Sequence, residues 1–126
     1  MNAIHHNRAV HHIERLAQRT VRTTRVLIAA RNIVATRWQQ GSYGVRGGDR
    51  CAMGALREAS KVSSVITTRV MAAVTALEVA MPWHFKFFMS KCRRTEMFND
   101  KHSQEEVVAL FDRAIAARME ANHAVR

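Results

Sequence analysis

Residues 103–119 read Ser-Gln-Glu-Glu-Val-Val-Ala-Leu-Phe-Asp-Arg-Ala-Ile-Ala-Ala-Arg-Met. Ser103 and Glu106 have the spacing of a capping box, in which each side chain bonds a free backbone N–H at the start of a helix. Apolar residues then recur every three or four positions, which is typical of one buried helix face. That stripe consists of Val107, Leu110, Phe111, Ala114, Ile115 and Met119. The stretch predicts a C-terminal helix that packs on the rest of the chain.

The first third of the chain also has helical periodicity. Residues 3–22 and residues 24–37 each carry apolar side chains at helical spacing, and neither stretch contains Gly or Pro. Arg31 falls on the apolar side of the first stretch when the same helical register is continued. Two readings therefore stay open, namely two separate helices or one helix whose buried face shifts.

The middle of the chain predicts a loop and two more helices. All five glycines lie between Gly41 and Gly54, so residues 38–50 favour a Gly-rich loop or a short β-hairpin. A helix is expected over residues 50–60, capped by Asp49 and facing the core with Cys51, Ala52, Ala55, Leu56 and Ala59. Another is expected over residues 62–81, stopped by Pro82.

The predicted fold class is mainly α, with about four to five helices in one domain, residues 1–126. The length of 126 residues suits a single domain, and 48% hydrophobic with 24% charged residues is ordinary globular composition. A disordered chain and a disulfide scaffold are therefore excluded. Within the domain, residues 1–22 are expected to form a basic amphipathic arm.

The sequence carries no pattern for export or membrane insertion. The N-terminus lacks a charged segment followed by an apolar run, and no uncharged apolar stretch approaches the length of a membrane span. Cys51 and Cys92 have no closely spaced cysteine partner, which favours two free thiols over a metal site, although a disulfide between them stays open. We expect a cytoplasmic chain with no cofactor and no membrane partner.

The net charge of +10 is unevenly distributed. Residues 1–57 carry ten Arg against only Glu14 and Asp49, whereas residues 58–126 carry ten Lys and Arg against eight acids. Arginine presents a planar fork that matches phosphate oxygens. An Arg-rich surface with few acids indicates contact with a polyanion or an acidic protein, and the alternative is a merely solvated face.

Six arginines are the candidate phosphate-binding residues. On a helix, Arg8, Arg15, Arg19 and Arg22 fall on one narrow stripe. Arg46 and Arg50 accompany the backbone amides of the Gly-rich loop, although that loop matches neither the dinucleotide-binding nor the P-loop pattern. A basic stripe of this kind would track a nucleic-acid backbone or hold nucleotide phosphates, and no recognition-helix motif predicts base readout.

Other chemistry-bearing residues give weaker patterns. His5, His6, His11 and His12 lack the carboxylate or thiolate neighbours that would complete a metal site, so no metal is expected. Cys51 follows Arg50 at a helix start, where a thiolate would be stabilised. The other candidate for an enzyme hypothesis is Asp100 with His102, acting as acid and base. The aromatic and basic stretch at residues 83–88 suits base stacking or a core with a basic edge.

The order of short motifs resembles a domain-of-unknown-function family of small bacterial and phage proteins. The motifs are Trp38 with Gly41, the stretch Cys51-Ala52-Met53-Gly54-Ala55-Leu56, the pair Asn99-Asp100, and the capped final helix. The resemblance covers residues 24–118 and implies an architecture rather than an activity. It implies structural roles, with Gly54 allowing close helix packing and Asn99-Asp100 forming a turn that leads into a helix. A phage or mobile-element accessory role, such as countering a host defence system, is compatible with that context.

Three functional hypotheses follow from the sequence. The first is a non-enzymatic basic protein that binds nucleic acid or a nucleotide through the six arginines. The second is an interaction module that forms a homo-oligomer or docks an acidic protein, with salt mattering less than apolar burial. The third is an enzyme that uses Cys51 or the Asp100–His102 pair.

Overall fold

The computed structural model of the chain describes residues 3–45, 47–61, 67–82 and 90–125. That part of the chain is mainly α, as predicted, and its helices follow one another as α1 (Ala3–Thr36), α2 (Ala52–Ser60), α3 (Thr68–Ala80), α4 (Lys91–Lys101) and α5 (Gln104–Val125). No strand occurs in those ranges. An isolated parallel bridge between Trp38 and Arg50 stands where a hairpin was one of the alternatives.

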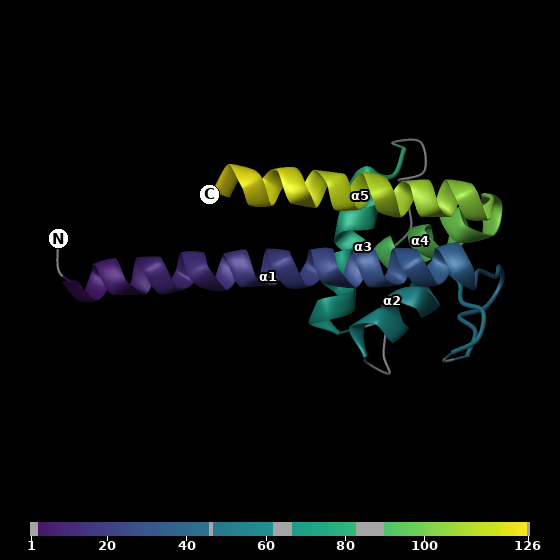
Figure 1. The fold of residues 1–126 in the computed structure, drawn as a ribbon, viewed down its shortest axis with the longest axis horizontal. Helices are drawn as coiled ribbons and strands as arrows, with labels where there is room; N and C mark the ends of the chain where they lie inside the picture. The colour runs from purple at the N-terminus through teal and green to yellow at the C-terminus, as the bar shows by residue number, and fades with distance from the viewer. Residues whose placement is uncertain (1–2, 46, 62–66, 83–89, 126) are drawn as a thin grey trace.

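Residues 3–36 form one continuous helix, which decides between the two readings of the N-terminal third. Arg31, the cation on the apolar side, lies against α5 and donates from Nε to Asp112 Oδ1 at 3.0 Å. α1 and α5 run antiparallel beside each other, and α2, α3 and α4 pack at the end of the pair where α1 finishes and α5 begins (Figure 1). Both termini therefore lie at the same end of the molecule.

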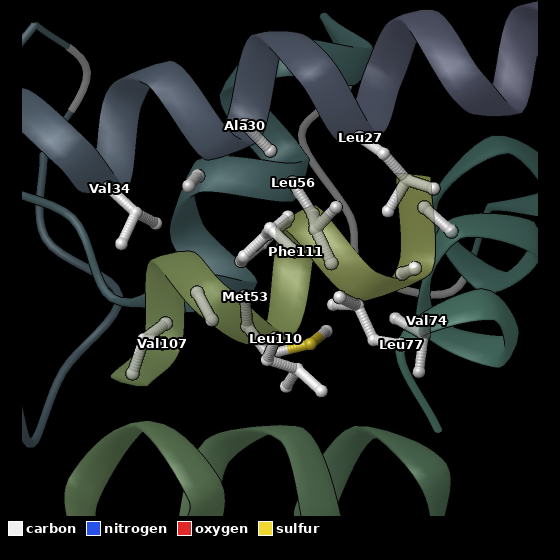
Figure 2. Close-up of a cluster of buried hydrophobic side chains, with 14 of the residues drawn as sticks. Leu27, Ala30, Val34, Met53, Leu56, Val74, Leu77, Val107, Leu110 and Phe111 are labelled. Carbon is white, nitrogen blue, oxygen red and sulfur yellow. The ribbon is translucent and has the colours of Figure 1, made fainter. Parts of the chain in front are cut away.

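The hydrophobic core fills the space between α1, α2, α3 and α5 (Figure 2). Helix α1 contributes Leu27, Ala30 and Val34, which recur every three or four residues and are fully buried. The other large buried side chains are Met53, Leu56, Val70, Val74, Leu77, Val107, Leu110 and Phe111. Because each helix presents one apolar stripe to this cluster, the amphipathic spacing of the sequence is converted into a single core.

The N-terminal part of α1, residues 3–22, extends beyond this core as an arm (Figure 1). At 1.5 Å per residue the arm is about 30 Å long. Its described side chains, from residue 8 onward, are exposed apart from half-buried Thr20, and burial begins at Thr23 and Thr24. The arm continues a helix already nucleated in the packed region, so it avoids the cost of starting a helix in water.

Capping explains most of the differences from the expected helix ends. The residue that caps α2 is Cys51, not Asp49, because the Cys51 Sγ accepts the backbone N–H of Gly54 at 3.4 Å. The predicted capping box of α5 is confirmed by reciprocal bonds between Ser103 and Glu106. α3 ends at Ala80, and Met81 already has extended backbone ahead of Pro82, which stops the helix as expected.

Two regions differ from the sequence prediction. Asn99 and Asp100 do not form a turn, because they lie inside the last turn of α4, and the chain reverses after it. Met119 was expected in the buried stripe of α5 but is 58% exposed, because α5 extends past the core at that point. The first residues of the helix predicted over 62–81, and the aromatic stretch at 83–88, lie outside the described residues.

Close backbone contact fixes how the Gly-rich loop sits on α2. A Cβ atom at Gly54 would lie 1.9 Å from the carbonyl oxygen of Tyr43, so only glycine allows the loop backbone to rest on the helix. This confirms the close packing role expected for Gly54. At Gly44, a positive φ of 78° and an equally close carbonyl of Asp49 impose the same restriction.

We predict that Gly54→Ala destabilises the protein by about 2–4 kcal/mol, because the new methyl group meets backbone that cannot move aside. Urea unfolding followed by circular dichroism measures this. Gly48→Ala is the matched control, since its Cβ would lie 2.9 Å from the Cγ2 of the exposed Val45 side chain, which can move, and 3.4 Å from the Val45 carbonyl oxygen, an ordinary contact distance. Equal stability of the two variants would contradict the packing role of Gly54.

Candidate polyanion interface

Two groups of cations among the described residues differ in whether an acid holds them. Five arginines are held by acids in ion pairs within the packed region: Arg31, Arg37, Arg50, Arg93 and Arg94. A second group has no acid within ion-pair distance in the described part of the chain: Arg8, Arg15, Arg19, Arg22, Arg25, Lys61 and Arg69. This second group lies along the arm and at its base. Some cations on α4 and α5 likewise form no ion pair among the described residues, namely Lys91, Lys101, Arg113 and Arg118, but these two helices also carry acids that offset their charge.

The arm presents four of the sequence-predicted arginines as one exposed stripe. Arg8, Arg15, Arg19 and Arg22 all lie on exposed helix, within about 60° of one another around the helix axis. Their Cα positions span about 21 Å along the helix. The single acid of the arm, Glu14, lies 3.6 Å from His11 rather than beside an arginine. The structure therefore brings these four predicted residues together.

A cavity of about 640 Å³ lies at the base of the arm. It is bounded by the middle of α1, the end of α2 and the start of α3. Five cations line it, namely Arg19, Arg22, Arg25, Lys61 and Arg69, and no Asp or Glu is among its described lining residues. Small apolar residues lie between the cations: Val26, Ala29, Ala59 and Ala72.

The arginine stripe of the arm leads directly into this cavity. Positions 15, 19, 22, 26 and 29 alternate in steps of four and three, so they share one face of α1. The face is basic along the arm, and beside α2 and α3, where it lines the cavity, the residues become half-buried Val26 and exposed Ala29. The stripe and the cavity thus form one continuous surface, with its cations at the entrance.

Arg50 and the Gly-rich loop do not join this surface. Arg50 is 7% exposed; its Nε donates to Glu58 and its Nη1 donates to the carbonyls of Tyr43 and Gly44. Glu58 also accepts the backbone N–H of Gly47 at 2.9 Å. The anion that the loop holds is therefore the chain's own carboxylate, and the expected phosphate contact of Arg50 is corrected. Arg46 lies outside the described residues.

Four of the positions singled out by the resemblance form one hydrogen-bonded cluster around Asn99: Trp38, Gly41, Asn99 and Asp100. The side-chain oxygen of Asn99, which is fully buried, accepts the indole N–H of Trp38 at 2.8 Å and the backbone N–H of Ala52 at 3.0 Å. Its amide donates to the carbonyl of Gln39 at 3.0 Å, and Asp100 accepts the N–H of Gly41 at 2.8 Å. These contacts join the end of α1, the loop, the start of α2 and α4, so they are structural.

Cys51 lies in the core, on the helix face predicted to be buried. Cys51 is 3% exposed, and burial raises the pKa of its thiol, with hydrogen bonds from backbone N–H groups opposing the shift. The expected stabilisation of a thiolate is therefore wrong at this position. His102 places Nδ1 2.8 Å from the carbonyl oxygen of Phe98 and stacks its ring on the Phe98 ring, which ties it to α4.

The remaining sequence features add little to the interface. Among the described residues no three His, Cys, Asp or Glu side chains are grouped as a metal ion requires. The side chains of His5 and His6 are outside the described set. Within the described helices, none combines the length and the apolar character that a bilayer crossing needs.

Sequence reasoning missed three cations of the cavity, Arg25, Lys61 and Arg69. Arg25 continues the run of N-terminal arginines, so the charge count gave a signal for it. Lys61 and Arg69 are isolated basic residues in the sequence, and only the packing of α2 and α3 against α1 brings them beside Arg19 and Arg22.

Comparison with models of protein families identifies the family to which the chain belongs. Residues 18–117 match the Family of unknown function (DUF6197), and the chain belongs to that family. No curated protein and no solved structure matches the chain. The matched region begins close to Thr23, where α1 becomes buried, so it includes the packed helices and the cavity and leaves out most of the arm.

We predict that Glu58→Gln weakens the acid dependence of stability. Hydrogen bonds from Arg37, Gly47 and Arg50 lower the pKa of Glu58 from 4.5 to about 2, against the opposing effect of burial. Because the pKa of Glu58 is lower in the folded state than in the unfolded state, its charged carboxylate stabilises the fold at pH values above the unfolded-state pKa. This contribution to stability is lost as the pH falls from 4.5 toward 2. Glu58→Gln should therefore be less stable than wild type near neutrality and lose less stability on acidification.

Urea unfolding at neutral pH and between those two pKa values tests this expectation. Glu120→Gln is the control, because Glu120 is exposed on α5 and its removal should leave the wild-type pH dependence intact. An unchanged pH dependence in Glu58→Gln would show that the hydrogen bonds from Arg37, Gly47 and Arg50 do not hold the Glu58 carboxylate in its charged form.

Proposed function

We propose that this protein binds a polyanion, and that nucleic-acid backbone is the ligand of the arm. The observation that carries the proposal is the exposed stripe of Arg8, Arg15, Arg19 and Arg22, none of which has an acidic partner in the described part of the chain. A surface that only needed solvation would interleave acids with these arginines, as the packed region does.

The mechanism is neutralisation of phosphates with release of counterions. Duplex DNA carries one charge per about 1.7 Å of its axis, so a stripe about 21 Å long meets several phosphates at once. The arm carries no element that reads base edges, and the interaction is therefore expected to depend on salt rather than on sequence. The side chains of residues 8–22 are exposed apart from half-buried Thr20, so they are accessible to a bound strand.

Replacing Arg8, Arg15, Arg19 and Arg22 together by Gln should reduce the salt dependence of DNA binding. Each lost phosphate contact reduces the slope of log K against log salt by about 0.9, so we expect a reduction of roughly three to four. Fluorescence anisotropy of a short labelled duplex of mixed sequence, titrated at several salt concentrations, measures the slope.

A second quadruple variant removes the same charge elsewhere. Lys91, Arg93, Lys101 and Arg113 are exposed on α4 and α5, and their replacement by Gln should leave most of the slope in place. Equal reductions in the two variants would assign the binding to overall charge, and an unchanged slope in the arm variant would refute the proposed interface.

The arm also carries an observation that favours self-association as a second function. Opposite the arginines lie Val10, Ile13, Leu16 and Val21, which are between 39% and 56% exposed although they are large and apolar. Ile13 and Leu16 continue the spacing of the buried α1 residues Leu27, Ala30 and Val34. Two arms pairing through this stripe would form a short helical dimer contact.

Salt separates this function from polyanion binding. Paired arms bring like charges together, so screening should strengthen self-association, whereas it weakens binding to DNA. Sedimentation equilibrium should show a dimer that tightens with salt and is lost in the Ile13→Gln/Leu16→Gln variant. A wild-type protein that is monomeric at every salt concentration would exclude the second function.

A further inference from the structure

The cavity at the base of the arm has the composition of a site for a single anionic group. Arg19, Arg22 and Arg25 come from α1, Lys61 follows α2 and Arg69 lies in the first turn of α3, so three separate segments converge there. Placing five like charges around one concavity is unfavourable unless an anion offsets them. None of the five has an ion-pair partner in the described residues, which leaves their donors available.

A buried hydroxyl in the cavity wall gives an independent sign of a missing partner. Ser60 lines the cavity and is 3% exposed, yet its Oγ has no hydrogen-bond partner in the described structure. Buried polar groups are nearly always hydrogen-bonded, because leaving one unpaired costs about 1–3 kcal/mol. A ligand oxygen beside Ser60 would satisfy this hydroxyl.

The start of α3 adds backbone polarity of the same sign. Thr68 and Arg69 line the cavity in the first turn of this helix, and that turn contains no acidic residue. Free N–H groups and the aligned peptide dipoles make a helix start favourable for an anion. The capping residue Thr67 bonds the N–H of Val70, so the earlier N–H groups of the turn are not used by the cap.

The size and the apolar surface of the cavity identify the rest of the ligand. A volume of about 640 Å³ lies within the range of small-molecule sites and is far larger than one phosphate needs. Apolar surface between the cations is provided by Val26, Ala29, Ala59 and Ala72. Small side chains of this kind leave room for a planar ring.

We propose that this cavity binds a phosphate monoester carried on a nucleoside-sized body. The phosphate would lie among Arg19, Arg22, Lys61 and Arg69, with Ser60 donating to it, and the base and sugar would rest on the apolar surface. The proposal rests on the proposed function to the extent that Arg19 and Arg22 belong to both surfaces. It goes further because it assigns a discrete site with its own residues.

Isothermal titration with AMP and with adenosine at low ionic strength tests the site. AMP should bind with one-to-one stoichiometry, and adenosine should bind at least about tenfold more weakly, because it lacks the charged group that the arginines hold. Absence of AMP binding, or equal affinity for the two compounds, would overturn the proposal.

Two charge-matched double variants locate the site. Lys61→Gln/Arg69→Gln removes two cavity cations, and we expect at least a tenfold loss of AMP affinity. Lys101→Gln/Arg113→Gln removes the same charge from the exposed surface of α4 and α5, and neither residue lines the cavity. That variant should lose less than about threefold. Equal losses would assign AMP binding to the general field and overturn the cavity.

Ser60→Ala separates a ligand contact from a structural one. Because the hydroxyl has no partner in the described structure, its removal should not reduce the free energy of unfolding, whereas AMP affinity should fall about three- to tenfold, the value of one hydrogen bond. Loss of stability together with unchanged AMP affinity would make Ser60 structural and count against the site.

Two oligonucleotides that differ only at one end distinguish the sources of the phosphate monoester. A 5′-phosphorylated strand that displaces AMP better than its 5′-hydroxyl counterpart supports the site with a strand end as its ligand. If both oligonucleotides displace AMP equally and weakly, the result supports the site with a free nucleotide as its ligand. The two proposals fail separately, since an unchanged salt slope in the arm variant refutes backbone binding while AMP binding that depends on Lys61 and Arg69 still stands.

Discussion

The buried side-chain amide of Asn99 is the contact on which the arrangement of the helices depends. From the last turn of α4 it bonds the indole of Trp38 after α1, the backbone N–H of Ala52 at the start of α2, and the carbonyl of Gln39 in the loop. A buried amide leaves costly unpaired groups if any partner moves away. The position of α2 against α1, and with it the near wall of the cavity, follows from this one side chain.

The second constraint is that some cations are paired with acids inside the protein and others are not. In the packed region several acids are held in ion pairs with arginines, and Glu58 alone holds both Arg37 and Arg50 together with the loop. The cations of the arm and cavity are left without acids of their own in the described residues. Because these cations are not paired with acids inside the protein, they can pair with an external anion. This is the physical basis of both proposals.

Part of the site was predictable from the sequence, and part was not. The stripe of Arg8, Arg15, Arg19 and Arg22 follows from helical spacing, and so does its continuation toward the core. Arg50 was a reasonable phosphate contact beside a Gly-rich loop, but in the structure its donors are held by Glu58, eight residues further along the chain, and by the carbonyls of Tyr43 and Gly44. Cys51 likewise had the local setting of an activated thiol, and burial among α1 and α2 side chains reversed the expected shift in its pKa.

The sequence by itself determined the helices, their capping at Ser103, the glycine required at position 54 and the concentration of arginine near the N-terminus. These depend on residues within one or two helical turns of each other, or on composition. Only the tertiary structure decided that residues 3–22 stand clear of the core, that Asn99 joins three segments, and that Lys61 and Arg69 meet Arg19 and Arg22 in one cavity. Such contacts join residues far apart in the chain, and local spacing carries no information about which distant segments will pack together.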